Sequence, residues 1–207
     1  MKKFIIPVVI TIFLSSSALA ENIQKEAIDS LATASTFVKK GNYSKAVEEI
    51  NYALSKINEL TASGLLKYIP KPPAGFTLDS KQSQGTGAAA SIAGNAGATA
   101  SYSGPNGSAL NVNIAIGGMT GKMASLAAFG QMFAGLAQNA GGPQTKQIRV
   151  HGYTGTLIFN GQEMNGTLTF QVGQKTSVTI EGNNIESPDV LISLAKNIDF
   201  QGLEDNF

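Results

Sequence analysis

The sequence predicts an α+β protein in which an N-terminal antiparallel helical hairpin precedes an antiparallel sheet covered by two helices. Three observations support this prediction. Apolar residues recur at three- and four-residue steps before residue 67, period-two strands with short turns follow residue 98, and apolar helical segments lie among and after those strands. We therefore expect a signal peptide at residues 1–20, the hairpin at 21–69, a proline-rich connector at 70–76 and the α+β domain at 77–207.

The first twenty residues have the three parts of a secretory signal in order. Met1–Lys3 is basic, an uncharged apolar run from Phe4 to Leu14 follows, and Ala18-Leu19-Ala20 ends the segment with an A-x-A cleavage pattern. The apolar run of about 11 residues is shorter than the roughly 20 that span a bilayer, which favours a cleaved leader over a permanent anchor. We predict cleavage between Ala20 and Glu21 and a periplasmic or secreted protein. The alternative is a buried N-terminal strand or helix.

The composition excludes several classes of protein. Charged residues make up 14% of the chain, against about 25% in a typical soluble protein. The 15 basic and 14 acidic residues form no basic cluster, so we expect no nucleic-acid partner. The chain has no cysteine, which excludes disulfides and a thiol-linked lipid anchor. A hydrophobic content of 43% is enough for a core that holds the exported protein together without covalent links.

Two amphipathic segments predict the helical hairpin. Lys39-Lys40-Gly41-Asn42 separates them and has the residues that end a helix. We expect Ser44 to cap the second helix, with Glu48 and Glu49 in its early turns. The predicted apolar stripes consist of Ile23, Ala27, Leu31, Ala34 and Val38 in the first helix, and of Val47, Ile50, Leu54, Ile57 and Leu60 in the second.

The stretch Gly41–Ile50 resembles part of a tetratricopeptide repeat, but the chain contains only one copy. Such repeats need several neighbours to bury their faces, so we expect a lone hairpin packed on the domain that follows. Pro70–Gly75 ends the helical region because proline cannot continue a helix. Gln82–Ala100 is rich in Gly, Ala, Ser and Gln and predicts a flexible loop. A mobile lid, or a slot for a partner strand, is the alternative for that segment.

The rest of the chain alternates strands with two helices. Ala98–Ser103 and Ala109–Ile116 flank the turn residues 104–107 and predict a β-hairpin. Further strands are expected at 147–150, 155–159, 167–172 and 176–181, with a helix at 120–140 before them. Ser187-Pro188-Asp189 opens a final helix. Its predicted buried stripe is Val190, Leu191, Leu194, Ala195 and Ile198.

Three stretches together resemble a group of small exported bacterial proteins of unknown function. They are Pro70–Phe76, Ala98–Ser103, and Ser177–Gly182 followed by Asp189–Leu203. The order strand, helix, strands, helix after Phe76 is also similar to the Mog1/PsbP-like α+β fold. That resemblance implies an accessory or binding domain. No catalytic residue can be carried over, because the matching stretches contain none.

No set of residues predicts catalysis, a metal or a cofactor. His151 is the single histidine and no cysteine is available, so we expect a solvated or hydrogen-bonded loop histidine. Gly117–Met123 is similar to a phosphate-binding loop, but its first glycine is one residue too close and Met123 replaces the magnesium-binding hydroxyl. The acids Glu48 and Glu49 point apart on a helix. Glu186 and Asp189 lie at a helix start, where acids are electrostatically favoured.

The predicted helix 120–140 offers a candidate interaction surface formed by Met119, Met123, Phe129, Met132 and Phe133. Methionine adapts to irregular partners, although the same residues would also pack well against the sheet. We therefore expect a non-catalytic exported domain that binds a protein partner or assembles with itself through this helix or the hairpin. The alternative is a domain that binds lipid or a membrane surface through the apolar helix. A hydrolase that uses His151 with a serine is a third possibility.

Overall fold

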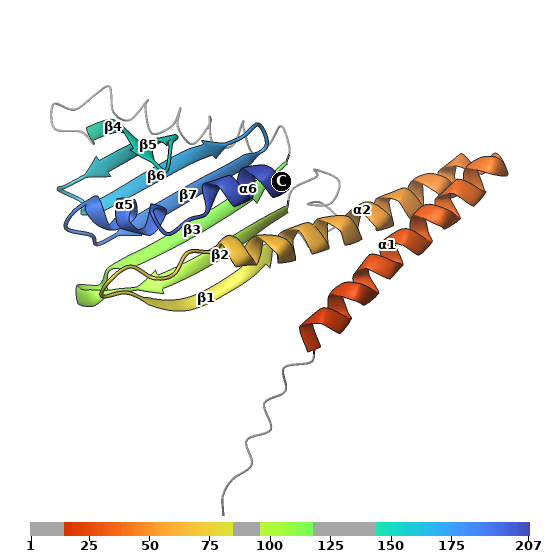
Figure 1. Cartoon of the computed structure of the whole chain (residues 1–207), viewed down its shortest axis with the longest axis horizontal. Helices are drawn as coiled ribbons and strands as arrows, with labels where there is room; N and C mark the ends of the chain where they lie inside the picture. Colours follow the sequence, from red (N-terminus) through yellow and green to blue (C-terminus); the bar gives the residue numbers. More distant parts are fainter. Residues whose placement is uncertain (1–14, 85–95, 118–143) are drawn as a thin grey trace, which may run out of the picture. The chain divides into compact units, whose positions relative to one another are not determined.

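The computed structural model describes residues 15–84, 96–117 and 144–207 of the 207-residue chain. These residues form two helices, then a sheet, then two short helices, which is the predicted α+β class (Figure 1). The chain divides into two compact units, of which the first ends at Ile57 and the second begins at Asn58. The division therefore falls within the second helix.

The first unit contains most of the predicted antiparallel hairpin. Helix α1 covers Ser15–Lys39 and helix α2 covers Tyr43–Leu65. Gly41 adopts a φ of 75° in the turn between them, a conformation that glycine tolerates best. The predicted cap at Ser44 is wrong, because α2 starts one residue earlier. Asn42 caps it instead, and its side-chain Oδ1 accepts a hydrogen bond of 3.3 Å from the Lys45 amide.

The strands of the second unit form one seven-stranded antiparallel sheet in the order β1-β2-β3-β7-β6-β5-β4. β2 and β3 are the predicted β-hairpin. The two-residue turn between β4 and β5 consists of His151 and Gly152, both at positive φ, which matches the twist of a tight hairpin. The strands are β1 Thr77–Gln84, β2 Ala96–Ser103, β3 Ala109–Ile116, β4 Gln144–Val150, β5 Tyr153–Asn160, β6 Asn165–Val172 and β7 Thr176–Asn183.

Two short helices cover one face of this sheet (Figure 1). Helix α5 covers Asp189–Ala195 and packs on β6 and β7, and helix α6 covers Phe200–Asn206 and packs on β6. Short 3-10 turns lie at Leu66–Tyr68 and Pro105–Gly107. Alternate residues of the strands point into the core under the helices, as the burial pattern of β3 shows. The largest fully buried side chains are Leu65, Tyr102, Leu110, Ile114, Leu168, Phe170, Ile180, Leu191, Leu194, Phe200 and Leu203.

The structure differs from two sequence-based expectations. The single final helix is two helices, because Asp199 leaves the helical conformation and its side chain caps α6 by accepting a hydrogen bond from the Gly202 amide. Ile198 is nevertheless buried, in the link between them. The loop expected at Gln82–Ala100 is strand at both ends, since β1 reaches Gln84 and β2 begins at Ala96. Backbone pairing across β2 stabilises these small residues as strand where composition alone predicts a loop.

Candidate functional site

The two helices of the hairpin meet through small side chains. Ala27, Ser30 and Ala34 of α1 are buried, and so are Ala46 and Ala53 of α2. Side chains of this size allow two helices to approach closely. The small residues recur at steps of three, four or seven, so they form one row along each helix.

Most of the large apolar residues of the hairpin are exposed, although Ile23 of the predicted α1 stripe is buried. In α1 and α2 they are between 36% and 68% exposed, although the sequence predicted that most of them lie in the two packing stripes. We call seven of them the hairpin stripe and leave out Leu19, Tyr52 and Ile57, which are exposed as well. It consists of Ile28, Leu31 and Val38 in α1 and of Tyr43, Val47, Ile50 and Leu54 in α2.

Both rows of the hairpin stripe lie on the same side of the hairpin. In each helix the exposed row follows the buried row by one residue, as Ile28 follows Ala27 and Leu54 follows Ala53. One residue is a turn of about 100° around the helix axis. Because the two helices are antiparallel, the same turn in each directs both rows to one side. The stripe also lies wholly after the predicted cleavage position at Ala20, so a cleaved chain keeps it.

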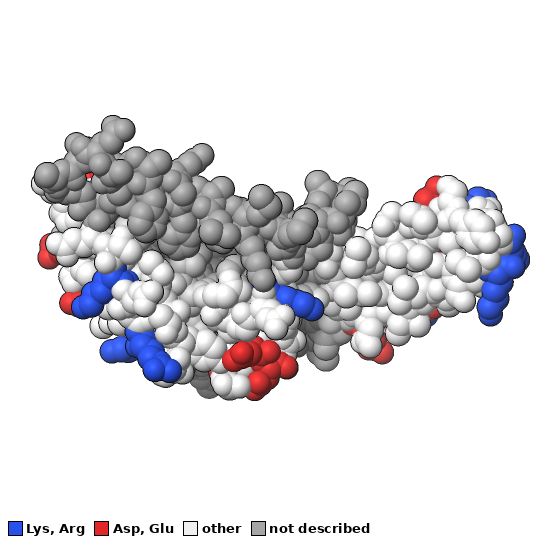
Figure 2. Space-filling model, turned by 90° about the horizontal axis from the view of Figure 1, so that it is seen from above, with Lys and Arg blue, Asp and Glu red and all other residues white. Residues whose placement is uncertain are grey.

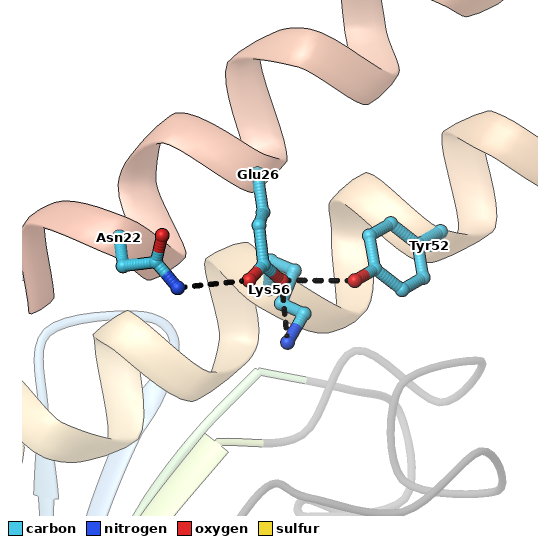
Figure 3. Close-up of polar contacts among 4 residues, drawn as sticks. All are labelled: Asn22, Glu26, Tyr52 and Lys56. Carbon is cyan, nitrogen blue, oxygen red and sulfur yellow. Dashed lines mark hydrogen bonds and ion pairs between the residues drawn. The ribbon is translucent and has the colours of Figure 1, made fainter. Parts of the chain in front are cut away.

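The opposite side of the hairpin is polar (Figure 3). Glu26 and Tyr52 each precede a buried alanine by one residue, and the Tyr52 hydroxyl donates a hydrogen bond of 2.9 Å to a Glu26 carboxylate oxygen. Lys56 Nζ forms an ion pair of 2.9 Å with the same oxygen, and Asn22 Nδ2 donates a hydrogen bond of 3.1 Å to the other. These contacts confirm that the positions before the buried row share one side.

The polar cluster shifts the pKa of two of its members. Hydrogen bonds from Lys56 and then from Tyr52 lower the pKa of Glu26, because they favour its charged form. The hydrogen bond to Glu26 raises the pKa of Tyr52, because it favours the protonated phenol. The hairpin therefore has one hydrogen-bonded polar side and one exposed apolar side.

A groove of about 250 Å³ lies at one end of the sheet. Three residues that line it have positive φ without being glycine: Asn106, Met164 and Asn184. Asn184 Nδ2 donates a hydrogen bond to the Asn106 carbonyl, and the Ile185 amide donates one to the Met164 carbonyl. These bonds join three loops that are far apart in the sequence. Sequence patterns did not indicate the groove, because its lining combines residues 184–190 with residues near 76, 105 and 164 that are distant in the sequence.

A polar hollow of about 350 Å³ lies at the ends of β5, β6 and β7. Its lining includes the amides of Asn160, Asn165 and Asn183 and the carboxylates of Glu163 and Glu181. Asn165 Nδ2 donates a hydrogen bond of 3.0 Å to Glu163. In the part of the chain that the structure describes, no three His, Cys, Asp or Glu side chains come together as a group that could hold a metal ion.

The structure shows the local surroundings of three other residues considered for chemistry. His151 is exposed in the β4–β5 turn, and its Nε2 contacts the Lys196 carbonyl oxygen at 2.8 Å. A carbonyl can only accept, so Nε2 carries the proton in this contact. Glu48 is exposed on α2, and Asp189 accepts a hydrogen bond from Ser187 at the start of α5.

Several candidates fall outside the described residues. Met119, Met123, Phe129, Met132 and Phe133 belong to this group, as does the loop 118–123 that is similar to a phosphate-binding loop. At the predicted cleavage site, Ala20 and Glu21 are exposed on α1. Among the helices that the structure describes, none has the length and apolar character needed to cross a bilayer.

The surface of the described residues carries few charges. In the view of Figure 2, scattered Lys, Arg, Asp and Glu side chains interrupt a surface that is mostly uncharged. Of the three surfaces considered, the hairpin stripe combines the most exposed apolar side chains. It is therefore the strongest candidate for a binding surface.

No protein-family model matches the chain, and neither a curated protein nor a solved structure matches it. The resemblance to the Mog1/PsbP-like fold therefore stays an expectation from sequence, and function has to be argued from the surfaces themselves.

Proposed function

We propose that this protein is a non-catalytic, exported protein-binding or assembly domain, and that the hairpin stripe is its binding surface. The observation that carries the proposal is the distribution of apolar residues in the hairpin. Apart from Ile23, the buried residues between the helices are alanine and serine, while the seven large apolar side chains of the stripe stay in contact with solvent.

The size of the stripe supports a binding role. From Tyr43 to Leu54 it extends about 17 Å along α2, and two helices are about 20 Å wide, so its footprint is roughly 350 Å². Apolar patches of ~300–600 Å² on soluble proteins often serve a function. Exposed isoleucine, leucine and valine side chains at this density would otherwise only reduce solubility.

The spacing within the stripe favours helices as the bound element. Tyr43, Val47, Ile50 and Leu54 are separated by four, three and four residues, which is the 3.5-residue period of helices that pack side by side. A lipid surface requires no such period. It would favour basic residues around the apolar face, and the stripe is flanked by both signs, including Lys39 and Glu48.

The non-catalytic assignment is supported by sequence. One histidine, no cysteine and no G-x-S-x-G motif leave few ways to build a nucleophile with a base. Export is supported by the leader at residues 1–20. N-terminal sequencing of native protein should begin at Glu21, and a start at Met1 in a cytosolic fraction would contradict export.

Site-specific cross-linking in living cells tests the binding role. A photoreactive amino acid at Val47 in the stripe should yield cross-linked protein adducts. The same amino acid at Thr36, which is exposed on α1 but two residues past the buried row, is the matched control. Adducts only from stripe positions would support the proposal, and adducts from neither position would overturn it.

The alternative lipid-binding role was predicted for residues 120–140, outside the described part of the chain. Flotation of the purified protein with anionic liposomes separates the two roles. Co-flotation that persists after Ile50→Glu would favour the lipid role and assign it to a surface other than the stripe.

A further inference from the structure

We propose that the tip of the helical hairpin binds the anionic headgroups of a phospholipid membrane. The tip consists of residues 37–45, which end α1, form the turn and begin α2. The proposal goes beyond the protein-binding role, because it assigns a second ligand to one end of the hairpin. It rests on the charges of the tip, their positions in the two helices and an exposed tyrosine.

The tip is positively charged. Lys39, Lys40 and Lys45 are exposed, and the chain has no Asp or Glu between residues 30 and 47. Among the residues that the structure describes, no acid forms an ion pair with these lysines, and Lys45 Nζ lies 5.6 Å from the centre of the Phe37 ring. Figure 2 shows Lys and Arg side chains gathered at the end of the hairpin. Three lysines are too few for nucleic acid, but the turn brings them to one end of the hairpin.

The acids nearest to the tip lie further back along the two helices. Glu48 and Glu49 follow Lys45 by three and four residues, which is about 4–6 Å along α2. Asp29 precedes Lys39 by ten residues, about 15 Å along α1. A membrane that touches the turn therefore meets the lysines before the acids. The charges nearest to the membrane dominate, because the screening length at physiological salt is about 8 Å.

Helix stability does not explain all the charges of the tip. The dipole of a helix favours bases near its C-terminus and acids near its N-terminus. Lys39 in the last turn of α1 agrees with this rule. Lys45 does not, because it lies in the first turn of α2, which contains no acid. A lysine there opposes the helix dipole, so an anionic ligand explains its charge better than helix stability does.

Hydrogen bonds in the turn hold the backbone of the tip in place. The Gly41 amide donates a hydrogen bond of 3.0 Å to the Val38 carbonyl, and the Asn42 amide donates one of 2.9 Å to the Phe37 carbonyl. These two bonds close the end of α1, and the Asn42 side chain caps α2. Because the backbone is already ordered, binding restricts only the lysine side chains, which limits the entropy lost.

Tyr43 gives the tip an apolar contact with the membrane. Its side chain is 68% exposed, and tyrosine is enriched at membrane interfaces because its ring is apolar while its hydroxyl stays hydrated. Each lysine close to an anionic surface strengthens binding by about fivefold. The three lysines of the tip together should therefore contribute about 100-fold to the affinity.

Flotation of the purified protein with lipid vesicles tests the proposal. We expect binding to vesicles of phosphatidylglycerol and phosphatidylcholine, no binding to phosphatidylcholine alone, and release when salt rises from about 50 to about 500 mM. Combining Lys39→Gln, Lys40→Gln and Lys45→Gln should weaken binding by about 100-fold. No binding to the anionic vesicles, or undiminished binding by the triple variant, overturns the proposal. Binding to soluble polyglutamate but not to vesicles would assign the tip to an acidic protein and also overturns it.

The matched control removes the same charge from another part of the chain. Lys146→Gln, Lys175→Gln and Lys196→Gln together also remove three exposed lysines, all from the second unit. This variant should bind the anionic vesicles as the natural protein does. An equal loss in both triple variants would show that net charge, and not the tip, causes binding. Circular dichroism shows whether both variants are folded.

A single tryptophan locates the contact without background, because the natural chain has no tryptophan. The fluorescence of Tyr43→Trp should shift to shorter wavelength when anionic vesicles are added. Ile28→Trp is the control, since position 28 lies about 17 Å from Lys39 along α1, and its fluorescence should not shift. An equal shift at both positions would mean that the side of the hairpin, and not its tip, contacts the membrane, which overturns the proposal.

Lipid binding by the tip and protein binding by the hairpin stripe can hold together, and different measurements report on them. Ile50→Glu leaves the three lysines in place, so this variant should still float with anionic vesicles. Adducts from Val47 in cells report on the stripe, whether or not the protein binds vesicles. Loss of flotation in Ile50→Glu would assign vesicle binding to the stripe and overturn the role of the tip.

Discussion

Glu26 on α1 and Lys56 on α2 form an ion pair of 2.9 Å that joins the two helices on the side of the hairpin opposite its exposed apolar residues. The pair lowers the pKa of Glu26, so the folded hairpin favours the charged carboxylate. The stability that this shift contributes is fully present above the pKa that Glu26 has in the unfolded chain. It is lost as the pH falls through the lower pKa that Glu26 has in the folded protein.

Replacing Glu26 by glutamine should therefore loosen the hairpin at neutral pH but not in acid. We expect faster amide hydrogen exchange in α1 of Glu26→Gln at pH near 7, and the same rates as the natural protein in acid strong enough to protonate Glu26, which its lowered pKa places below the usual glutamate range. Added salt should reduce the difference, because the pair is near the surface. Glu48→Gln, at an exposed position of α2, is the control. An equal effect of both substitutions would show that the ion pair is not the cause.

Ala53→Leu should destabilise the hairpin. Ala53 is fully buried between the helices, and an added isobutyl group would force them apart at a cost of about 1–3 kcal/mol. The comparison is Leu54→Ala at the next position, where the side chain is 36% exposed and the change should stay within about 0.5 kcal/mol. Thermal loss of the helical circular dichroism signal, measured in dilute solution, distinguishes the two. A larger loss from Leu54→Ala would contradict the assignment of buried and exposed rows.

Gly155→Ala should destabilise the sheet domain. A Cβ at Gly155 would lie 2.6 Å from the Phe170 ring, and that ring is held against Phe200 with ring centroids 4.7 Å apart. Moving packed aromatic rings costs about 1–3 kcal/mol. Gly161→Ala is the control, since its Cβ would meet Phe159 at an ordinary 3.6 Å. Urea denaturation should give a lower midpoint for Gly155→Ala than for Gly161→Ala. Equal midpoints would contradict the close packing of Gly155 against Phe170.

Stability should fall in alkali because Tyr102 is buried. Loss of solvent raises the pKa of Tyr102 to about 12, whereas tyrosine in an unfolded chain titrates near 10. The folded state thus holds this proton more tightly, and its contribution is complete below pH ~10 and lost as pH rises toward 12. Tyr153, whose pKa is also about 12 because of its hydrogen bond to Glu204, adds to the same window.

Tyr102→Phe should weaken this alkaline dependence and also lower stability at neutral pH. The Tyr102 hydroxyl donates a hydrogen bond of 2.7 Å to the carbonyl of the buried Pro70. Leaving that carbonyl without a donor costs about 1–3 kcal/mol. Urea midpoints from pH 7 to 11 test both effects. Tyr43→Phe, at an exposed position, should change neither, and a pH profile of Tyr102→Phe that is unchanged would contradict the assignment.

The main elements could be predicted from periodicity. The 3.6-residue recurrence of apolar residues predicted both long helices, and alternation predicted the β2–β3 hairpin and β5 to β7, because each pattern reflects burial of one side of a regular element. The missed strand β1 and the ends of the Gly/Ala-rich segment lack that alternation. Their pairing with β2 gives them their structure, and such pairing is not visible in a single segment.

The hairpin stripe, too, could be predicted from the sequence only in part. Sequence alone predicted the helical hairpin and its apolar stripes, whereas a non-catalytic role and a secretory leader at residues 1–20 stay predictions. Only the tertiary structure decided which part of each stripe is buried. Apart from Ile23, the side chains buried between the helices are alanine and serine, because antiparallel helices that approach closely leave most room for small side chains. The larger residues, one position further on, therefore remain exposed.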